Sequence, residues 1–420
     1  MAFATLWLEK KALFPQLVEE PSEKSTGIIV VIPAFDEPEI AKLLDSLASC
    51  TPPSCGVEII VIVNAGLDAA EESILNNRLC VDSVIKWKST NPGCFFRLFV
   101  FDTGRSLIPG WGAGLARKTG MDEALRRFST AGNPEGVIVS LDADCTVEKN
   151  YFTSVCNDLL YDNDKCACSI YFEHPVSGTE FPEDVYRHIT LYELHMRYFV
   201  RGMGYSGFPW PFHTIGSAMA VKALRYMHAG GMNRKQAGED FYFIRKLLPA
   251  GGYFNLNSTT VFPSPRKSFR VPFGTGPSMI RFMEKNENIF FSYNIKAFEE
   301  LKVLFCDIEK LFCFGSEETK NHYRNIPEGI RSFISYDEWL PAIDEIRRNT
   351  SSSVSFRKRF FVWFDMLRIV RYLNHVHKNH FTKQNITEAS GKLLLLNGDS
   401  LECDDPRSLL TYYRLLDKNT

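Results

Sequence analysis

Short apolar runs alternate with helical stripes along the first 172 residues of the chain. Residues 27–33 (GIIVVIP) and 57–63 (VEIIVIV) are apolar and β-branched almost throughout, as is typical of strands covered on both faces in a parallel sheet. Residues 37–49 between them carry apolar side chains at helical spacing, so the three segments predict a βαβ unit. The same patterns predict further strands at 97–101, 137–141 and 167–172, and a helix at 113–128. We therefore expect an α/β fold with a doubly wound open sheet.

Helical patterns dominate the rest of the chain. A predicted helix around residues 186–196 ends at a cluster of Gly and Pro between 202 and 211, which predicts a loop. Residues 217–228 and the segment that begins at Gly238 predict two more helices, and helices with charged faces follow over 278–314 and 323–416. We predict three parts: an N-terminal extension (1–26) that lies on the main body as a short helix, an α/β domain (27–265) and a helical C-terminal region (266–420).

Composition narrows the class of protein. The chain has 420 residues, 45% of them hydrophobic, which is enough for an enzyme-sized α/β domain with a helical addition. A formal net charge of −2 lacks the electrostatic signature of a nucleic-acid-binding protein, so we expect no nucleic-acid partner. The eleven cysteines form no CxxC pair, and the sequence shows neither a charged-then-apolar leader nor a long continuous apolar run. We expect reduced thiols and a cytoplasmic protein.

One helical stripe adds a second expectation about location. Residues 356–380 combine an apolar stripe with Arg and Lys at its start. Such a helix either packs on its own domain, which we favour, or lies on the anionic inner face of a membrane near a lipid-linked acceptor. Contact with a membrane surface is therefore the disfavoured alternative.

Candidate chemistry first appears at Asp142 and Asp144, where the predicted strand 137–141 ends. Along an extended backbone, side chains at i and i+2 share a face, so both carboxylates should project together from the carboxyl end of a buried strand. Open α/β sheets bind their ligands at this edge. Mg²⁺ or Mn²⁺ often combines one or two carboxylates with substrate phosphates. The pair favours a metal–diphosphate site, with plain turn and cap chemistry as the alternative.

Five segments extend this hypothesis to a known family. They are VIPAFDE (31–37), VIVNAG (61–66), GAGLARKTGMDEAL (112–125), SLDAD (140–144) and AGED (237–240), the last aspartate lying 96 residues beyond Asp144 (240 − 144). In this order and spacing they resemble the family 2 glycosyltransferases of the GT-A fold, which use nucleoside diphosphate sugars. The resemblance covers residues 27–265 and implies a GT-A-type sheet, whereas the last third of the chain carries no motif of the family.

The resemblance implies that the end of the first strand binds the nucleotide sugar. Pro33 and Ala34 would shape the loop against the nucleotide, and Asp36 or Glu37 would contact it. The family usually has Asn-Glu at the last two positions. Helix capping ahead of a proline explains the two acidic residues equally well.

Three further positions would contact the donor by the same resemblance. Asn64 stands where the family usually has aspartates that accept the N–H of uracil. Because an amide also donates, this departure leaves the nucleobase open. Arg117 and Lys118 would approach the base or the phosphates, with a solvated basic helix face as the alternative.

The metal and the catalytic carboxylates also follow from the resemblance. Asp144 would bind the Mn²⁺ or Mg²⁺ that bridges the two phosphates, and Asp142 would lie near the ribose and the metal-bound waters. Asp240, in the first turn of a predicted helix, would be ionised and act as the general base, with Glu239 orienting the acceptor. Acidic residues are also common there as plain helix structure.

Two less specific positions complete the predicted site. His213 precedes a stretch of small residues and would contact a ligand or the substrate, with a structural histidine as the alternative. Arg266 opens a basic loop with Lys267 and Arg270, which would close over the diphosphate unless it is a plain exposed turn.

These expectations combine into one function and its alternatives. We expect a metal-dependent, hexosyltransferase-like glycosyltransferase that moves a sugar from a nucleoside diphosphate sugar to the hydroxyl of a carbohydrate or lipid-linked acceptor, with inversion. A retaining GT-A enzyme that makes a glycosylated small acid is one alternative, and a non-catalytic nucleotide-sugar-binding module is another. A sugar nucleotidyltransferase is disfavoured because PAFDEPE contains neither glycine nor a cation.

Overall fold

The computed structural model describes residues 2–106, 108, 111–235, 238–266, 289–399 and 403–419. The chain forms two compact units. The first contains residues 1–189, 214–284 and 416–420, and the second contains residues 190–213 and 285–415. The divisions between these units do not coincide with the expected boundaries at 26 and 265. Residues 190–213 belong to the same unit as residues 285–415. The expected three-part organisation stays a prediction.

The first unit is built on one eight-stranded sheet in the order β3-β2-β1-β4-β7-β6-β8-β5. Its strands are β1 (Thr26–Ala34), β2 (Gly56–Ala65), β3 (Phe96–Arg105), β4 (Val137–Ser140), β5 (Thr146–Val147), β6 (Ala167–Phe172), β7 (Met219–Lys222) and β8 (Tyr253–Phe262). The four strands β3-β2-β1-β4 pair in parallel, β7 runs antiparallel to both β4 and β6, and β8 is parallel to β6. The α/β class and the doubly wound open sheet are confirmed, and the sheet is mixed.

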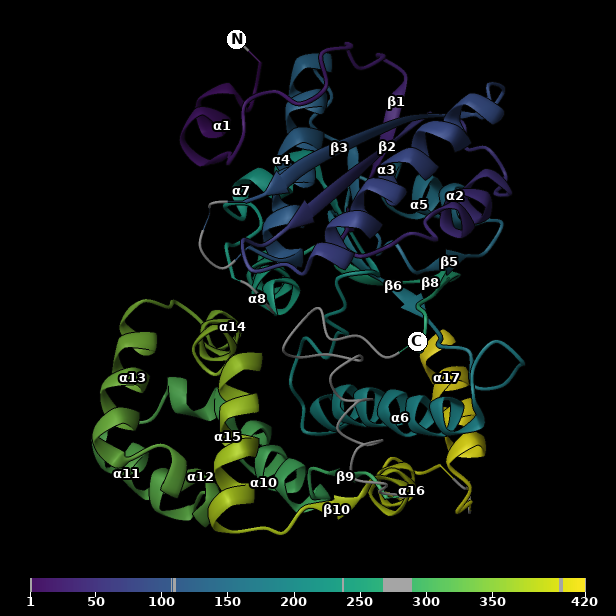
Figure 1. The fold of residues 1–420 in the computed structure, drawn as a ribbon. Helices are drawn as coiled ribbons and strands as arrows, with labels where there is room; N and C mark the ends of the chain where they lie inside the picture. Colours follow the sequence, from purple (N-terminus) through teal and green to yellow (C-terminus); the bar gives the residue numbers. More distant parts are fainter. Residues whose placement is uncertain are drawn as a thin grey trace. The chain divides into compact units, whose positions relative to one another are not determined.

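Helices cover both faces of this sheet (Figure 1). They are α1 (Thr5–Lys11), α2 (Ala41–Ala48), α3 (Glu71–Thr90), α4 (Ala113–Ala131), α5 (Tyr151–Val155), the π-helical turn η1 (Cys156–Leu160), α7 (Ala223–His228), α8 (Glu239–Leu247) and the 3₁₀ turn η2 (Leu248–Ala250). Right-handed crossovers place α2 and α3, which pack together, on one face and α4 on the other. Every residue of β1 is buried, which explains its continuous apolar run.

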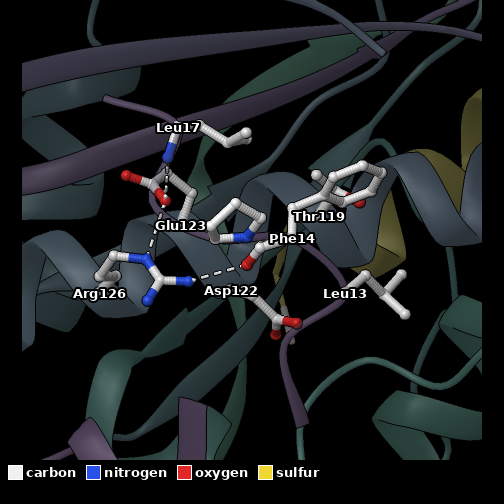
Figure 2. Close-up of a pocket in the computed structure, with 8 residues that line it drawn as sticks. Leu13, Phe14, Leu17, Thr119, Asp122, Glu123 and Arg126 are labelled. Carbon is white, nitrogen blue, oxygen red and sulfur yellow. Dashed lines mark hydrogen bonds and ion pairs between the residues drawn. The ribbon is translucent and has the colours of Figure 1, made fainter. Parts of the chain in front are cut away.

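The N-terminal residues form the expected short helix, α1, which packs on α4. The segment that follows α1 is hydrogen-bonded to α4. Glu123 of α4 accepts hydrogen bonds from the backbone N–H groups of Leu17 and Val18, at 3.1 and 3.2 Å. Arg126 donates to the same carboxylate and to the carbonyl of Phe14, at 3.1 and 3.2 Å (Figure 2). These contacts give an otherwise irregular segment fixed partners for its backbone.

Two local predictions in this unit are wrong. Residues 217–228 form the strand β7 followed by α7 instead of one helix. Their short apolar run suits either state, and pairing with β4 and β6 decides for a strand at its start. The backbone also leaves the strand before Asp142: β4 ends at Ser140, and the N–H of Cys145 donates to the carbonyl of Asp142 at 3.2 Å in a turn.

The second unit is helical. Its elements are β9 (Phe291–Ser292), α10 (Ile295–Cys306), the 3₁₀ turn η3 (Ile308–Phe312), α11 (Ser316–Asn325), α12 (Glu328–Phe333), α13 (Tyr336–Arg348), α14 (Ser353–Trp363), α15 (Met366–Asn379), β10 (Gln384–Asn385) and α16 (Ile386–Leu396). The helices α6 (Glu183–Tyr205) and α17 (Pro406–Lys418) each have residues in both units. The part of the expected helical region at 278–288 lies outside the described residues, as do Lys267 and Arg270.

The predicted single helix at 356–380 is two helices. The chain breaks between α14 and α15 at Asp365, whose side chain accepts from the N–H of Arg368 at 3.0 Å and caps α15. The apolar stripe is buried in this unit through residues such as Phe360 and Ile369, which is the favoured alternative. Within the described ranges, no helix is long and apolar enough to cross a bilayer.

Candidate active site

The sheet topology brings distant segments to one edge. The strands β1, β4 and β8 run in the same direction, so the residues that follow them, Glu37, Asp142 and Arg266, emerge at their carboxyl ends. The strand β7 runs the other way, and its register pairs Met219 with Ser140. The segment just before β7, which includes Gly216, therefore lies at the same edge. This is the edge at which open α/β sheets bind ligands.

Arg117 of α4 is the centre of one cluster at this edge. Its guanidinium donates to Ser140 Oγ at 2.8 Å, to Asp142 Oδ1 at 2.6 Å and to Glu239 Oε1. The Arg117 side chain is only 4% exposed. A Cβ at Gly216 would lie 2.8 Å from Arg117 Nη2, so the chain can pass this close only as glycine. The arginine therefore has a fixed position between the aspartate turn and α8.

The head of α8 carries both predicted catalytic carboxylates. Glu239 is buried and bonded to Arg117, and its backbone carbonyl accepts from Asn233 Nδ2 at 2.8 Å. The first turn of α4 comes so close that a Cβ at Gly114 would lie 3.0 Å from Glu239 Cγ. Asp240 Oδ1 accepts from the N–H of Phe241 at 2.7 Å. Among the described residues, Asp240 forms no ion pair.

The environment of Asp240 changes its proton affinity. Burial raises the pKa of the Asp240 carboxyl, and the charge of Asp142 adds to the rise. The Arg117 guanidinium and the N–H of Phe241 act in the opposite direction but do not cancel it. We expected the helix N-terminus to keep this carboxylate ionised. Desolvation acts against the helix terminus and makes the Asp240 carboxylate more basic.

Arg266 forms a second cluster at the same edge. Its Nε donates to Asp144 Oδ2 at 2.9 Å, and its Nη2 donates to Glu37 Oε1. Burial opposes the charge on Arg266, but Asp144 and Glu37 outweigh it and raise its pKa above the ordinary arginine value. The guanidinium is therefore cationic and shared by two carboxylates from different strands.

Among the described residues of these two clusters and Asp240, carboxylates outnumber guanidiniums. Five carboxylates accompany two guanidiniums, a formal −3 if all are ionised; the groups are Glu37, Asp142, Asp144, Glu239, Asp240, Arg117 and Arg266. Asp142 and Asp144 remain 41% and 27% exposed. Within the described residues, no three His, Cys, Asp or Glu side chains could hold an ion by themselves. Two partly exposed carboxylates do fit a Mg²⁺ or Mn²⁺ that completes its shell with substrate phosphates and water.

The residue expected to read the base, Asn64, forms hydrogen bonds within the protein. Asn64 is buried near the end of β2; its Nδ2 donates to the carbonyl of Ala34 at 2.8 Å, and its Oδ1 accepts from Trp111 Nε1 at 2.9 Å. The side chain therefore uses both its donor and its acceptor within the protein. Pro33 and Ala34 are buried in β1. The role of Asn64 in reading a base stays a prediction, and it requires an exchange of these bonds.

Asp36 has an unusual backbone conformation next to this position. Its φ of 58° lies in the left-handed region, which non-glycine residues seldom adopt. Two asparagines of α3 hold it: Asn77 Oδ1 accepts from the Asp36 N–H at 2.9 Å, and Asn76 Nδ2 donates to Asp36 Oδ1 at 2.6 Å. We did not predict Asn76 or Asn77 as site residues. Two consecutive asparagines inside a long helix, where propensity disfavours them, were the available signal.

Lys118 and His213 are the remaining predicted residues. Lys118 is buried and donates to Asp122 Oδ2 at 2.7 Å, four residues along the same helix, with its ammonium 5.5 Å from the ring centre of Trp7. His213 belongs to the second unit. Their nucleotide contacts stay predictions without support from these contacts.

Comparison with known proteins gives only weak similarity. No protein-family model matches the chain, and no curated protein matches its sequence. TarS 1–349 from S. aureus matches with 11% identity and a TM-score of 0.36, over 93% of this chain and 90% of the other. The mannosyltransferase PcManGT from Pyrobaculum calidifontis, in complex with GDP-Man and Mn²⁺, matches with 14% identity and a TM-score of 0.37, over 99% and 91%.

A third solved structure extends the same picture. Glucosyl-3-phosphoglycerate synthase from Mycobacterium tuberculosis, in complex with Mn²⁺, UDP-Glc and phosphoglyceric acid, matches with 14% identity and a TM-score of 0.31, over 55% of this chain and 70% of the other. At these TM-scores the matches carry no argument about this chain. The functional argument therefore rests on the residues at the carboxyl edge of the sheet.

Proposed function

We propose that this protein is a glycosyltransferase that moves a sugar from a nucleoside diphosphate sugar to an acceptor hydroxyl. One observation carries the proposal: the aspartate turn after β4 and the start of α8 meet at one edge of the sheet, where Asp142 and Glu239 both bond Arg117. Sugar transfer needs these two chemical functions side by side. One neutralises a departing diphosphate, and the other receives the proton of the attacking hydroxyl.

Each side of the edge has its own role in this proposal. Asp142 and Asp144 would hold a Mn²⁺ or Mg²⁺ together with the donor phosphates. When bound, such an ion supplies a Lewis acid for the charge that develops on the leaving diphosphate. Arg266 offers a guanidinium for the same phosphates, because guanidinium–phosphate pairs are often bidentate. Glu37 and Asp36 would position the loop after β1.

Asp240 is the proposed general base. It has no ion-pair partner among the described residues, in contrast to Glu239, which Arg117 holds in place. A pKa raised by burial increases the basicity of Asp240, and an efficient general base has a pKa closer to the working pH. Inverting transfer, a carbohydrate or lipid-linked acceptor and a cytoplasmic location belong to the same proposal.

The test separates chemistry from donor binding in one variant. Asp240→Asn keeps the shape but removes the base, so we expect turnover to fall about 10²–10⁴-fold. Binding of UDP- or GDP-sugars, followed as stabilisation in thermal unfolding, should change little because the phosphate contacts lie elsewhere. Asp82→Asn, at an exposed position of α3, is the matched control and should leave both readouts unchanged.

Two outcomes would count against this assignment. Near-normal turnover in Asp240→Asn would remove Asp240 from the mechanism. Loss of donor binding with an intact fold would assign Asp240 to the nucleotide and favour a retaining enzyme. If no nucleotide sugar stabilises the wild-type protein and no transfer is detected, the glycosyltransferase proposal itself fails.

A further inference from the structure

Glu37 and Asp144 share one guanidinium, although they follow different strands. Arg266 bonds both carboxylates. The side chain of Glu37 is 7% exposed, that of Asp144 is 27% exposed and that of Arg266 is 26% exposed. A nearly buried carboxylate such as Glu37 is stable only with a hydrogen-bonded partner of opposite charge. In this arrangement Arg266 is that partner.

The sheet register builds this contact into the fold. The strand β5 pairs with β8 so that Thr146 lies opposite Phe262. Asp144 precedes Thr146 by two residues, and Arg266 follows Phe262 by four, so the pairing delivers the guanidinium to the aspartate turn. The contact is therefore more than an encounter of two mobile surface side chains.

The two arginines at this edge differ in how firmly they are held. Arg117 is 4% exposed and bonds a hydroxyl as well as two carboxylates. Arg266 is 26% exposed and bonds only carboxylates in the described contacts. A divalent cation that takes Asp144 as a ligand must compete with Arg266. Of the two guanidiniums, Arg266 is the one that can leave with less disruption of the packing.

We infer that Arg266 occupies the cation position of Asp144 in the ligand-free protein and releases it to a divalent ion when a diphosphate arrives to receive the guanidinium. The inference rests on the proposed function, because the diphosphate is that of the donor. A diphosphate supplies oxygen ligands for the ion and a bidentate partner for the displaced arginine. Metal and nucleotide should therefore strengthen each other's binding, and the coupling must be reciprocal.

The experiment measures binding of Mn²⁺ alone, without catalysis. Free Mn²⁺ is followed by its electron paramagnetic resonance signal during titration of the wild-type chain and of Arg266→Gln. We expect the variant to bind Mn²⁺ about tenfold or more tightly than the wild type, because the guanidinium that competes for Asp144 is removed. Repeating the titration with saturating UDP or GDP, against protein-free blanks, should strengthen Mn²⁺ binding in the wild type and much less in the variant.

Two controls locate the effect. Arg225→Gln removes a guanidinium that donates to the carbonyls of Ala250 and Gly251, and it should leave Mn²⁺ affinity unchanged. The double variant Asp144→Asn with Arg266→Gln should lose the gain in affinity. If Arg266→Gln does not fold because Glu37 loses this guanidinium, Glu37→Gln with Arg266→Gln removes both charges together and still tests the competition at Asp144.

The outcomes distinguish this inference from the proposed function. Equal Mn²⁺ affinity in the wild type and in the folded Arg266 variants overturns the inference, as does a gain that survives Asp144→Asn. In either case nucleotide-sugar binding and transfer can remain intact, so the glycosyltransferase proposal stands. If the glycosyltransferase proposal fails, neither the wild type nor any variant will show stabilisation by nucleotides or sugar transfer, independently of its Mn²⁺ affinity.

Discussion

Helix α4 places a guanidinium at each edge of the sheet, and the two edges differ in charge balance. At the amino edge, Arg127 forms a two-pronged pair with Glu58 of β2, and Arg97 donates to the same carboxylate at 3.3 Å. The Glu58 side chain is 0% exposed, and the hydroxyls of Ser22 and Thr26 also donate to it. Here two cations and two hydroxyls surround the Glu58 carboxylate, and Arg97 also donates to Glu20 at 2.8 Å, so the cations and carboxylates of this network balance.

At the carboxyl edge, carboxylates outnumber guanidiniums among the described residues of the two clusters. Arg117 contacts two carboxylates, Asp240 adds a third charge nearby, and Asp142 is 41% exposed. A closed network with enough cations needs no ligand. An edge with surplus, partly exposed carboxylates is stabilised further by an added cation or proton. The same residue type on one helix therefore supports the fold at one end and contacts the carboxylates of the proposed binding site at the other.

Breaking the closed network should have the largest effect on stability. Glu58→Gln leaves the buried Arg127 without its carboxylate, which typically costs about 3–5 kcal/mol, while Arg97 keeps its bond to Glu20. The free energy of unfolding from urea titration measures this loss. Nucleotide binding by the folded fraction should be unchanged. A loss below about 1 kcal/mol would contradict the buried character of this network.

Arg117→Gln should destabilise the protein less and impair function more. Glu239 would remain buried without its cation, but Asp142 can turn to water, so we expect a loss of about 2–3 kcal/mol in the free energy of unfolding. Transfer activity should be lost because the aspartate turn and α8 lose their common partner. Arg126→Gln on the same helix, which breaks contacts to Glu123 and Phe14, is the matched control. Full activity in Arg117→Gln would show that the two clusters act independently.

Much of the fold could be predicted because its central strands are buried on both faces. Runs such as residues 27–33 and 57–63 have one physical explanation, whereas MAVK in 217–228 suits a strand or a helix until its neighbours are known. The break at Asp365 depends on one capping side chain inside a long amphipathic pattern. The spacing of apolar residues therefore predicts the type of element where a strand is buried on both faces. It fails where strand pairing or a capping side chain decides between a strand and a helix, or where a helix ends.

The sequence predicts candidate site residues one by one, but it does not predict which of them pair. Asp142 and Asp240 follow from strand-end and helix-start patterns, but their common neighbour Arg117 requires the crossover that brings α4 to the edge. The i, i+2 argument assumed an extended backbone, whereas the chain turns after Ser140. Arg266 reaches Asp144 only through β5–β8 pairing, and sequence spacing does not show that register.

Asn64 offers a smaller test of the two edges. Asn64→Asp keeps an acceptor for Trp111 but places carboxylate oxygen against the Ala34 carbonyl, so we expect a loss of about 1–2 kcal/mol in the free energy of unfolding. At the amino edge, the half-buried Asn133 donates to the Thr26 carbonyl at 3.0 Å. Asn133→Asp should therefore lower the free energy of unfolding by less than Asn64→Asp. Urea unfolding gives both values.

The same variant also tests base recognition. If Asn64 reads the nucleobase, Asn64→Asp should change the order of affinities among nucleoside diphosphates in thermal shift, since a carboxylate accepts but does not donate. An unchanged order would assign Asn64 to the fold alone. Equal destabilisation by both substitutions would contradict an effect that follows the deeper burial of Asn64 relative to Asn133.

The smallest expected effect is a pH dependence that comes from the surplus carboxylates. Burial raises the pKa of Asp240 in the folded protein above its value in the unfolded chain. Between the two values the native state binds the proton more strongly, so the free energy of unfolding falls as pH rises through this interval. The amide in Asp240→Asn does not titrate, so the variant should lack this decline. Its stability relative to the wild type should be lowest near pH 4, rise with pH and become constant above the raised pKa. Urea unfolding at a series of pH values measures the difference, and Asp82→Asn, at an exposed position, is the control. A constant or falling difference for Asp240→Asn would mean that the carboxylate is already balanced, as at the amino edge, and would remove the contrast between the two ends of α4.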